Sequence, residues 1–377
     1  MRQPFHAHRA DLAALAAEDR RRTLVPRAGI DFASNDYLGL AGSAALRDAL
    51  SQGIARGLPA GSGGSRLLRG NHAEHEALET HAARHYGSEA ALFFPTGFAA
   101  NAALFATLPQ RGDLIVHDEL IHASAHDGMK LGRADIRAAA HNDAQAFDDA
   151  VVAWRKAGGT GTPWIAVESL YSMDGDTAPL ADLAIVAARH DAVLVVDEAH
   201  ATGVFGPAGQ GLAHGLASRE RLITLHTCGK ALGCEGALLC GPQIVRDFLV
   251  NRGRPFIFST APSPLMAWLV RQALEIVATE PERPARLHAL VRHAEARLAA
   301  LGLPASGSQI LPVVIGDNAR AMRVAGALQA AGFDVRGIRP PTVPQGTARL
   351  RIAITLNVAE SDIDAMTGAL ADAMAAA

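Results

Sequence analysis

The stretch that decides the fold is VLVVDEAH, residues 193–200. Its first four residues are all apolar and predict a strand buried on both faces of a sheet, as strands of parallel sheets are. Asp197 follows this run directly, and His200 comes three residues later. Ligands of open α/β sheets bind at the carboxyl ends of the strands, so a ligand site is expected at Asp197. On this stretch alone, an acid that caps the next helix or binds Mg²⁺ fits equally well.

Apolar runs on both sides of this stretch extend the same pattern. Helical patterns such as residues 180–190 lie between them. Alternation of strands and helices on this scale predicts a doubly wound α/β domain with a mainly parallel sheet. The other expected strands are Ala91–Phe94, Leu114–Val116, Trp164–Val167, Leu222–Leu225 and Gly236–Cys240.

The pattern changes after Pro262-Ser263-Pro264. A helical stretch over 265–301, broken near Pro281 and Pro284, leads into alternating strands and helices that predict a smaller α+β domain. We therefore expect an N-terminal helix and arm at 1–40, a large domain at 41–275 and a small domain at 276–377. The expected elements of the small domain are strands at 310–315, 333–338 and 349–354 and helices at 319–331 and 361–375.

Composition excludes several classes of protein. The chain has 377 residues, 19% of them charged, and a formal net charge of −3, which lacks the basic footprint of a nucleic-acid binder. The charged N-terminal segment lacks the apolar region of a signal peptide, and no stretch is long and apolar enough to span a membrane. The three cysteines form no CxxC pair and match no common zinc spacing. Their low, odd number predicts a reducing compartment, the cytoplasm.

A lysine lies in a small, glycine-flanked turn after another expected strand, in the segment TLHTCGKALG at 224–233. Lys230 follows Asp197 by 33 residues, enough for one intervening helix and strand. A Schiff-base lysine needs a lowered amine pKa and close approach of a cofactor, which glycines permit. A lysine on a surface loop is the alternative, but this context favours a site.

Two further segments offer partners for a ligand. FPTGFAAN, residues 94–101, joins an expected strand to an expected helix, and free N–H groups at a helix start bind anions. His122 lies five residues after His117, so the two cannot share a helical face as zinc ligands do, and we expect no metal there. The glycines of 61–66 follow no apolar strand, which argues against a nicotinamide dehydrogenase fingerprint.

Eight motifs occur together in a fixed order over residues 31–354, most of the chain. They are 34–40 (SNDYLGL), 61–66 (GSGGSR), 96–101 (TGFAAN), 172–176 (SMDGD), 197–200 (DEAH), 229–233 (GKALG), 256–260 (FIFST) and 338–344 (IRPPTVP). In these motifs the chain resembles the α-oxoamine synthase family of fold-type-I pyridoxal 5′-phosphate (PLP) enzymes. The resemblance implies an aspartate-aminotransferase-like large domain of three layers with a mainly parallel sheet, and a smaller α+β C-terminal domain.

The resemblance also implies roles for individual residues. Lys230 would hold PLP as a Schiff base and act as general base, and Asp197 would pair with the pyridine nitrogen. His200 would hydrogen-bond the phenolic oxygen of PLP, and His122 would stack on the ring. The remaining cofactor contacts would be the phosphate-binding amides of Gly97 and Phe98, the hydroxyl of Thr227, Ser172 beside the cofactor, and Thr260, reaching the phosphate of the partner subunit in a homodimer.

For the substrates, the resemblance implies a decarboxylative condensation of an amino acid with an acyl thioester carried by CoA or acyl-carrier protein. Arg349 is expected to clamp the amino-acid carboxylate, with Arg351 left open as the alternative; Asn35 and Arg20 would line the substrate pocket. The IRPPTVP run, followed by Gly346–Arg351, favours L-alanine and a pimeloyl thioester. Glycine with acetyl-CoA, or another α-oxoamine synthase reaction, is the alternative.

Overall fold

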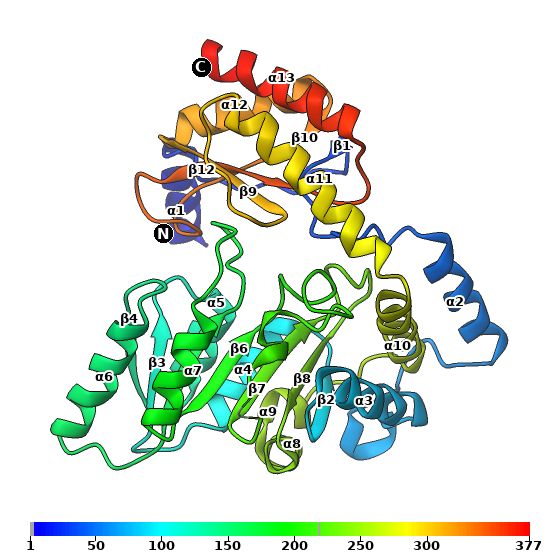
Figure 1. Ribbon diagram of the computed structural model, residues 1–377, viewed down its shortest axis with the longest axis vertical. Coiled ribbons are helices and arrows are strands. Elements are labelled where there is room, and N and C mark those ends of the chain that lie inside the picture. The colour runs from blue at the N-terminus through cyan, green and yellow to red at the C-terminus, as the bar shows by residue number, and fades with distance from the viewer. Residues whose placement is uncertain (1–3, 218) are drawn as a thin grey trace. The chain divides into compact units, whose positions relative to one another are not determined.

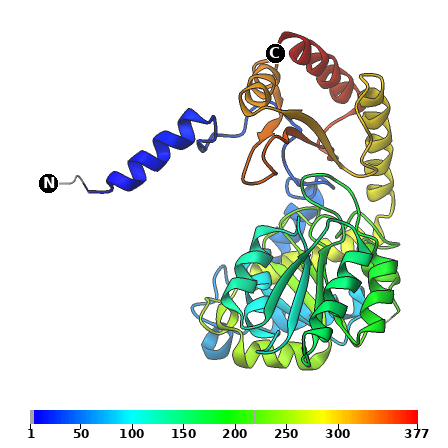
Figure 2. The same ribbon diagram turned by 90° about the vertical axis from the view of Figure 1, so that its left-hand side faces the viewer.

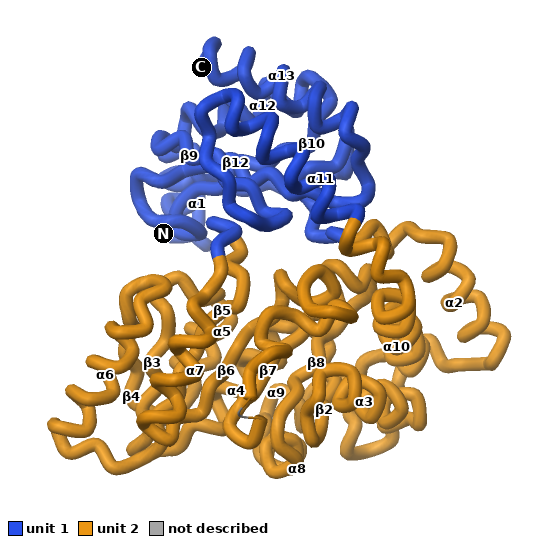
Figure 3. The backbone as a smooth tube through the Cα atoms, in the orientation of Figure 1, with its two compact units in different colours: residues 1–37, 173–176, 286–377 blue, residues 38–172, 177–285 orange. Residues whose placement is uncertain are grey.

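The computed structural model describes residues 4–217 and 219–377, which group into two compact units (Figure 3). The larger unit comprises residues 38–172 and 177–285. The smaller unit comprises the chain up to Tyr37 together with 173–176 and 286–377, so it takes in both terminal segments and a short excursion from the middle. The division into domains at residues 40 and 275 stays a prediction.

The larger unit is built on a mainly parallel sheet in the order β2-β8-β7-β6-β5-β3-β4. Only β8 runs antiparallel to its neighbours. This arrangement confirms the predicted α/β class with an aminotransferase-like sheet. The strands are β2 (Ala90–Phe94), β3 (Leu114–Asp118), β4 (Asp135–Ala139), β5 (Pro163–Glu168), β6 (Val193–Asp197), β7 (Leu222–Thr227) and β8 (Ala237–Gly241).

Helices cover both faces of this sheet, because successive residues of each strand point to opposite sides. On β3, Ile115 faces a core formed with α4, α5, α8 and α9, whereas Leu114 and Val116 face a core formed with α6 and α7 (Figure 1). The helices are α2 (Ala44–Ala55), α3 (Ala73–Tyr86), α4 (Gly97–Thr107), α5 (Ala123–Leu131), α6 (Ala144–Lys156), α7 (Leu180–Arg189), α8 (Gln243–Arg252), α9 (Arg254–Ile257) and α10 (Pro264–Thr279), with the short turns η1 (Arg66–Gly70) and η2 (Leu212–Gly215).

The parallel strands end at one edge of the sheet. Glu168, the last residue of β5, pairs with Asp197, the last residue of β6. Asp197 in turn pairs with Leu225 on β7, two residues before that strand ends at Thr227. The residues that follow β5, β6 and β7 therefore start from adjacent positions, and this edge can gather polar side chains from distant parts of the sequence.

The smaller unit contains a three-stranded antiparallel sheet in the order β11-β12-β9 and a short parallel pair, β1 with β10. Its N-terminal helix α1 buries none of its residues and extends away from these sheets (Figure 2). The elements are α1 (His6–Ala17), β1 (Ile30–Asp31), most of α11 (Glu282–Ala299), β9 (Ile310–Gly316), α12 (Asn318–Ala330), β10 (Phe333–Asp334), β11 (Arg336–Ile338), β12 (Ala348–Ala353) and α13 (Glu360–Ala376).

Two predicted details differ from the structure. Strand β4 was not predicted, because it lies at the sheet edge and its polar, partly exposed residues lack the apolar run that marks its neighbours. The single strand predicted at 333–338 is two short strands, and β10 and β11 belong to different sheets. Across residues 4–217 and 219–377, no helix combines the length and apolar character needed to cross a bilayer.

Candidate active site

Lys230 lies in the loop that follows β7, and its side chain meets a residue that follows β6. The Lys230 Nζ is 2.7 Å from Nε2 of His200, whose ring is 4% exposed. The chain has three lysines, and the other two, Lys130 and Lys156, lie exposed on helices α5 and α6. Lys230 is therefore the one lysine of the chain whose amine lies within a group of buried polar side chains.

Asp197 is held firmly at the end of β6 and is 7% exposed. Its Oδ1 accepts a hydrogen bond from the amide of Ala199 at 3.0 Å. Its Oδ2 accepts a second hydrogen bond from the side-chain amide of Asn101, on helix α4, at 2.9 Å. Each carboxylate oxygen thus has a fixed donor, which orients the group.

His122 caps the N-terminus of α5. Its Nδ1 lies 2.8 Å from the Ser124 hydroxyl and accepts from the Ser124 amide at 3.2 Å. Burial lowers the pKa of His122; Asp197 opposes this shift and Lys230 adds to it. An imidazole that accepts through Nδ1 and resists protonation is neutral and carries its proton on Nε2.

Glu168 is a second acid at this edge of the sheet and is 2% exposed. Burial raises the pKa of Glu168, as does the Asp197 carboxylate, whereas Lys230 and the His122 amide oppose the shift. Its Oε1 is buried with no hydrogen-bond partner among the described residues. A protonated carboxyl fits this position, since an ionised one beside Asp197 would be repelled.

The turn between β2 and α4 forms a cradle for an anion. Thr96 caps the helix through its Oγ1, which accepts from the Ala99 amide at 3.0 Å. The amides of Gly97 and Phe98, in the first turn, have no carbonyl one turn earlier to bond, and they lie at the positive end of the helix dipole. A Cβ placed on Gly97 would lie 3.7 Å from Oγ1 of Thr227, so that hydroxyl borders the same turn.

These features fit PLP group by group. The cradle at Gly97, Phe98 and Thr227 offers donors to a phosphate. The Lys230 amine can condense with an aldehyde, and the Asp197 carboxylate can hold a proton on a ring nitrogen. All of these residues belong to the larger unit.

Two predicted cofactor contacts lie further along the chain. Ser172 follows β5 by four residues and is partly buried. Thr260 is exposed in the loop before α10, where the next residue, Ala261, donates its amide to Gly64 of the glycine cluster at 2.9 Å. In the described part of the chain, Thr260 has no contact with the Lys230 group, and its predicted reach to a second subunit stays a prediction.

The predicted substrate residues all belong to the smaller unit, and the two candidate arginines have different partners. Arg349 forms an ion pair with Asp174, and its Nε donates to the Thr347 carbonyl at 3.0 Å. Arg351 donates to the Tyr37 hydroxyl at 3.3 Å, and that hydroxyl donates to Oδ1 of Asn35 at 3.0 Å. Residues two apart on a strand share a face, and both arginines are buried, so strand position does not distinguish them.

Arg20 belongs to a group of guanidinium side chains around the IRPPT segment. Its Nε donates to the Pro340 carbonyl at 3.1 Å. Arg22 donates to the hydroxyl of Thr342 at 2.9 Å, and Arg339 contacts the carbonyl of Asp19. Burial and then the neighbouring charge of Arg22 lower the pKa of Arg339.

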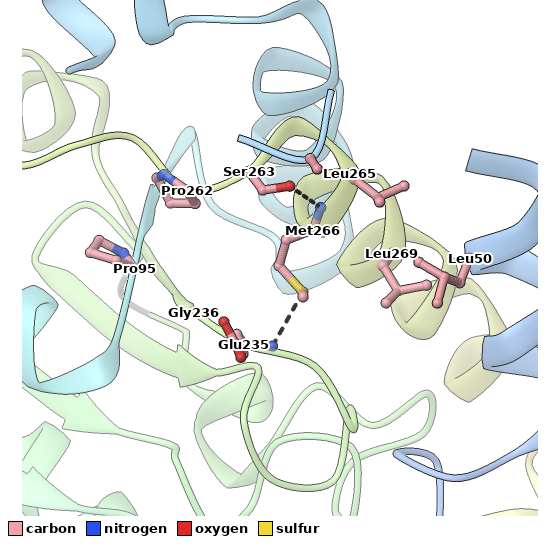
Figure 4. A pocket seen from close by; sticks show the side chains of 10 residues that line it. Leu50, Pro95, Glu235, Gly236, Pro262, Ser263, Leu265, Met266 and Leu269 are labelled. Atoms are coloured by element: carbon pink, nitrogen blue, oxygen red, sulfur yellow. Dashed lines mark hydrogen bonds between the residues drawn. The ribbon is translucent and has the colours of Figure 1, made fainter. Parts of the chain in front are cut away.

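A pocket of about 300 Å³ opens at the start of β8 (Figure 4). Met266 and Leu269 line it from α10, and Pro95 lines it from the turn before the anion cradle. Gly236, also in its wall, accepts a hydrogen bond from Thr227 Oγ1 at 3.4 Å. The pocket adjoins the cradle but includes none of the reactive groups around Lys230.

The prediction from sequence missed three residues of this site. Asn101 lies four residues after Gly97, one helical turn along the same face of α4, so the spacing within FPTGFAAN could have indicated it. Ser124 follows His122 by two residues, as a helix-capping partner does. Glu168 ends an apolar run just as Asp197 does, so the same strand-end rule applied to β5 would have found it.

The chain is similar to several known proteins. Residues 27–370 match the family model described as aminotransferase class I and II. The 8-amino-7-oxononanoate synthase of Anaeromyxobacter dehalogenans strain 2CP-1 is 42% identical over 378 residues, covering 96% of this chain and 94% of the relative. The structure of 8-amino-7-oxononanoate synthase from Francisella tularensis superposes with a TM-score of 0.78 at 27% identity, over 91% of this chain and 97% of that one. Serine palmitoyltransferase from S. paucimobilis, with a bound PLP–myriocin aldimine, has a TM-score of 0.88 at 26% identity and covers 99% of this chain and 98% of that one.

Proposed function

Because the chain belongs to the aminotransferase class I and II family, we propose that it catalyses the PLP-dependent reaction of an 8-amino-7-oxononanoate synthase. L-Alanine condenses with a pimeloyl thioester, and the products are 8-amino-7-oxononanoate, CO₂ and the free thiol, a step of biotin biosynthesis. The observation that carries the proposal is the grouping of Lys230, His200 and Asp197 at the ends of adjacent strands beside an anion cradle.

PLP, when bound, supplies an electron-withdrawing pyridine ring that stabilises negative charge at the α-carbon of the amino acid. Lys230 would hold the cofactor covalently, and its Nζ would be the base that takes the proton from that carbon. The Lys230 amine is 2.7 Å from Nε2 of His200, so His200 can hold the amine in position. Lys230 is the only lysine beside the buried acids, which is why the base is assigned to it.

The other cofactor residues have separable tasks. Asp197, held by the Ala199 and Asn101 donors, keeps a proton on the ring nitrogen. His122, fixed by its hydrogen bond with Ser124, would stack on the ring. The remaining assignments are phosphate binding by Gly97, Phe98 and Thr227, a hydrogen bond from Ser172 beside the ring, and a reach of Thr260 to the phosphate in a second copy of the chain, which makes the working enzyme a homodimer.

Each substrate carries a carboxylate, and arginine side chains of this chain can bind both of these groups. Arg349 binds the carboxylate of L-alanine, since a guanidinium holds a carboxylate through two parallel hydrogen bonds. Asp174 is its partner in the absence of substrate. Arg20 and the neighbouring Arg22 bind the far carboxylate of the pimeloyl group, and Asn35 completes the pocket. The close approach of Arg22 to Arg339 supports an anion at this place.

The donor of the pimeloyl group is a thioester of CoA or of acyl-carrier protein. The enzyme works in the cytoplasm, a location that the low, odd number of cysteines supports. Neither assignment changes the chemistry at Lys230, because both donors present the same thioester carbon.

Mass spectrometry of the products tests the proposal. The purified chain is mixed with PLP, pimeloyl-CoA and either L-alanine or glycine. The proposal predicts 8-amino-7-oxononanoate from L-alanine and little condensation product from glycine. A product only from glycine with acetyl-CoA would assign the chain to glycine C-acetyltransferase instead. Binding of PLP without product from either amino acid would remove the substrate assignment.

A further inference from the structure

Asn101 lies inside helix α4 and forms hydrogen bonds with Asp197 and Ser124. It is 3% exposed. Its side-chain nitrogen donates to Asp197 Oδ2 and to the Ser124 hydroxyl oxygen, both at 2.9 Å. An ionised carboxylate can only accept, so the amide face turned toward Asp197 is the NH₂ group. Both of its protons are used, and no other side chain of this size can give two such bonds.

The chain of hydrogen bonds continues from Ser124 to His122. Since the Ser124 oxygen accepts from Asn101, the Ser124 proton is left for Nδ1 of His122, 2.8 Å away. The backbone amide of Ser124 also points at this nitrogen. Nδ1 is therefore an acceptor twice over, and the imidazole keeps its proton on Nε2. The Asn101 amide thus orients the Asp197 carboxylate. Through the Ser124 hydroxyl it also sets the tautomer of the His122 imidazole.

We infer that Asn101 is a positioning residue that couples Asp197 to His122. It aligns the Asp197 carboxylate at the ring nitrogen together with the His122 imidazole on the ring face. This inference rests on the proposed function for its identification of PLP as the ligand. The sequence motif and the family comparison assign Asn101 no role, and the proposed mechanism uses it only as a donor to Asp197.

The coupling has a chemical consequence at the ring nitrogen. The donor to Oδ2 fixes the orientation of the carboxylate, so that it can accept a hydrogen bond from a protonated ring nitrogen. Without Asn101 the carboxylate would lose this fixed orientation, and the ring would withdraw electrons less strongly. The other titratable groups that interact with Asp197 are Glu168 from β5, His122 at the start of α5 and Glu198, the next residue. Lys230 also acts on His122 and Glu168.

The test compares Asn101→Leu, Asn101→Asp and Ser124→Ala with the parent enzyme. Leucine keeps the volume and removes both donors; aspartate keeps the shape and replaces them with acceptors; alanine at 124 breaks only the arm to His122. Thr367→Val is the matched control, since Thr367 on α13 is also 3% exposed and loses a buried hydrogen bond. The readouts are the pH titration of the visible absorbance of bound PLP, the dissociation constant of PLP, and kcat with KM for L-alanine.

We expect both Asn101 variants to displace the midpoint of the absorbance titration by about half a pH unit or more. Loss of a hydrogen bond to a charged group predicts a kcat about 10- to 100-fold lower, with KM for L-alanine changed less than about threefold. Ser124→Ala should give a smaller displacement, and Thr367→Val none. If Asn101→Leu does not fold, Asn101→Asp and Ser124→Ala decide the question.

Titrations of Asn101→Asp and Ser124→Ala that match the parent would overturn the inference. A displacement of the titration midpoint by Thr367→Val as large as that by the Asn101 variants would also overturn it. The effect would then come from loss of any buried hydrogen bond and not from Asn101. The absorbance readout does not depend on the acyl substrate. A parent enzyme that binds PLP but makes no 8-amino-7-oxononanoate would therefore remove the proposed substrates and leave this test intact.

Discussion

Glu198, between Asp197 and His200 in the strand-end motif, should make stability depend on pH in a way that one substitution removes. Its carboxylate is fully buried. It accepts from the Ser169 hydroxyl and the Ala213 amide, both at 2.5 Å, and from the Leu212 amide at 3.1 Å. Burial raises the pKa of Glu198 to about 7, against the opposing effect of these three donors.

The sign follows from comparing the folded and unfolded chains. The ordinary pKa of this carboxyl is 4.5, so between pH 4.5 and about 7 the unfolded chain releases a proton that the folded chain keeps. Stability from this group is therefore present below pH 4.5 and is lost as the pH rises through about 7. A shift of this size removes about 3 kcal/mol of stability at pH 8 and about 1 kcal/mol at pH 5, so about 2 kcal/mol is lost between these two pH values.

Glu198→Gln cannot ionise and should lose this dependence. At pH 5 the variant should be less stable than the parent by about 1–3 kcal/mol, because the new NH₂ group faces a backbone donor. At pH 8 the two should be nearly equal. Urea unfolding of both chains at pH 5, 6, 7 and 8 measures this, with exposed Glu282→Gln as the control. A stability difference that stays constant over this range would refute the reasoning.

Three further substitutions test other parts of the account. Gly236→Ala should lower the free energy of unfolding by about 2 kcal/mol or more, since its φ is +101° and an added Cβ would overlap the Phe93 ring. Thermal melting measures this loss, and an unchanged melting temperature would contradict it. Arg349→Lys should raise KM for L-alanine about tenfold through loss of two-point binding, and a larger rise for Arg351→Lys would transfer the role. Burial lowers the pKa of His226 far below 6.5, so the parent loses stability as the pH falls below 6.5. His226→Gln should thus gain up to about 2 kcal/mol relative to the parent between pH 7 and pH 5 in urea unfolding, and no gain would contradict this.

The sequence predicted the central sheet well because its strands are buried on both faces. Runs such as Val193–Val196 are apolar throughout, and that signal depends on burial alone. Strand β4 carries no such signal, since Asp135 and Ile136 are exposed at the sheet edge. The split at Val335 was also invisible, because pairing with β1 or with β12 is decided by distant segments.

The site was predictable where a residue type is unusual in its context and unpredictable where a contact joins distant segments. Lys230 in a glycine-flanked turn was such an unusual residue. The bond from Asn101 to Asp197 spans 96 residues, and nothing near Asn101 in sequence indicates its acceptor. The sequence could not distinguish Arg349 from Arg351 for a different reason. Both lie on the same face of β12, and only their partners differ.

The most direct test of the central claim is to locate the cofactor on the chain. The purified protein is incubated with PLP, reduced with borohydride, digested and analysed by mass spectrometry. The chain has only three lysines, so the assignment is unambiguous. The account predicts the reduced phosphopyridoxyl group on the peptide that contains Lys230 and on neither of the others. Labelling of Lys130 or Lys156 at the same level, or a Lys230→Ala variant that still turns over substrate, would contradict it.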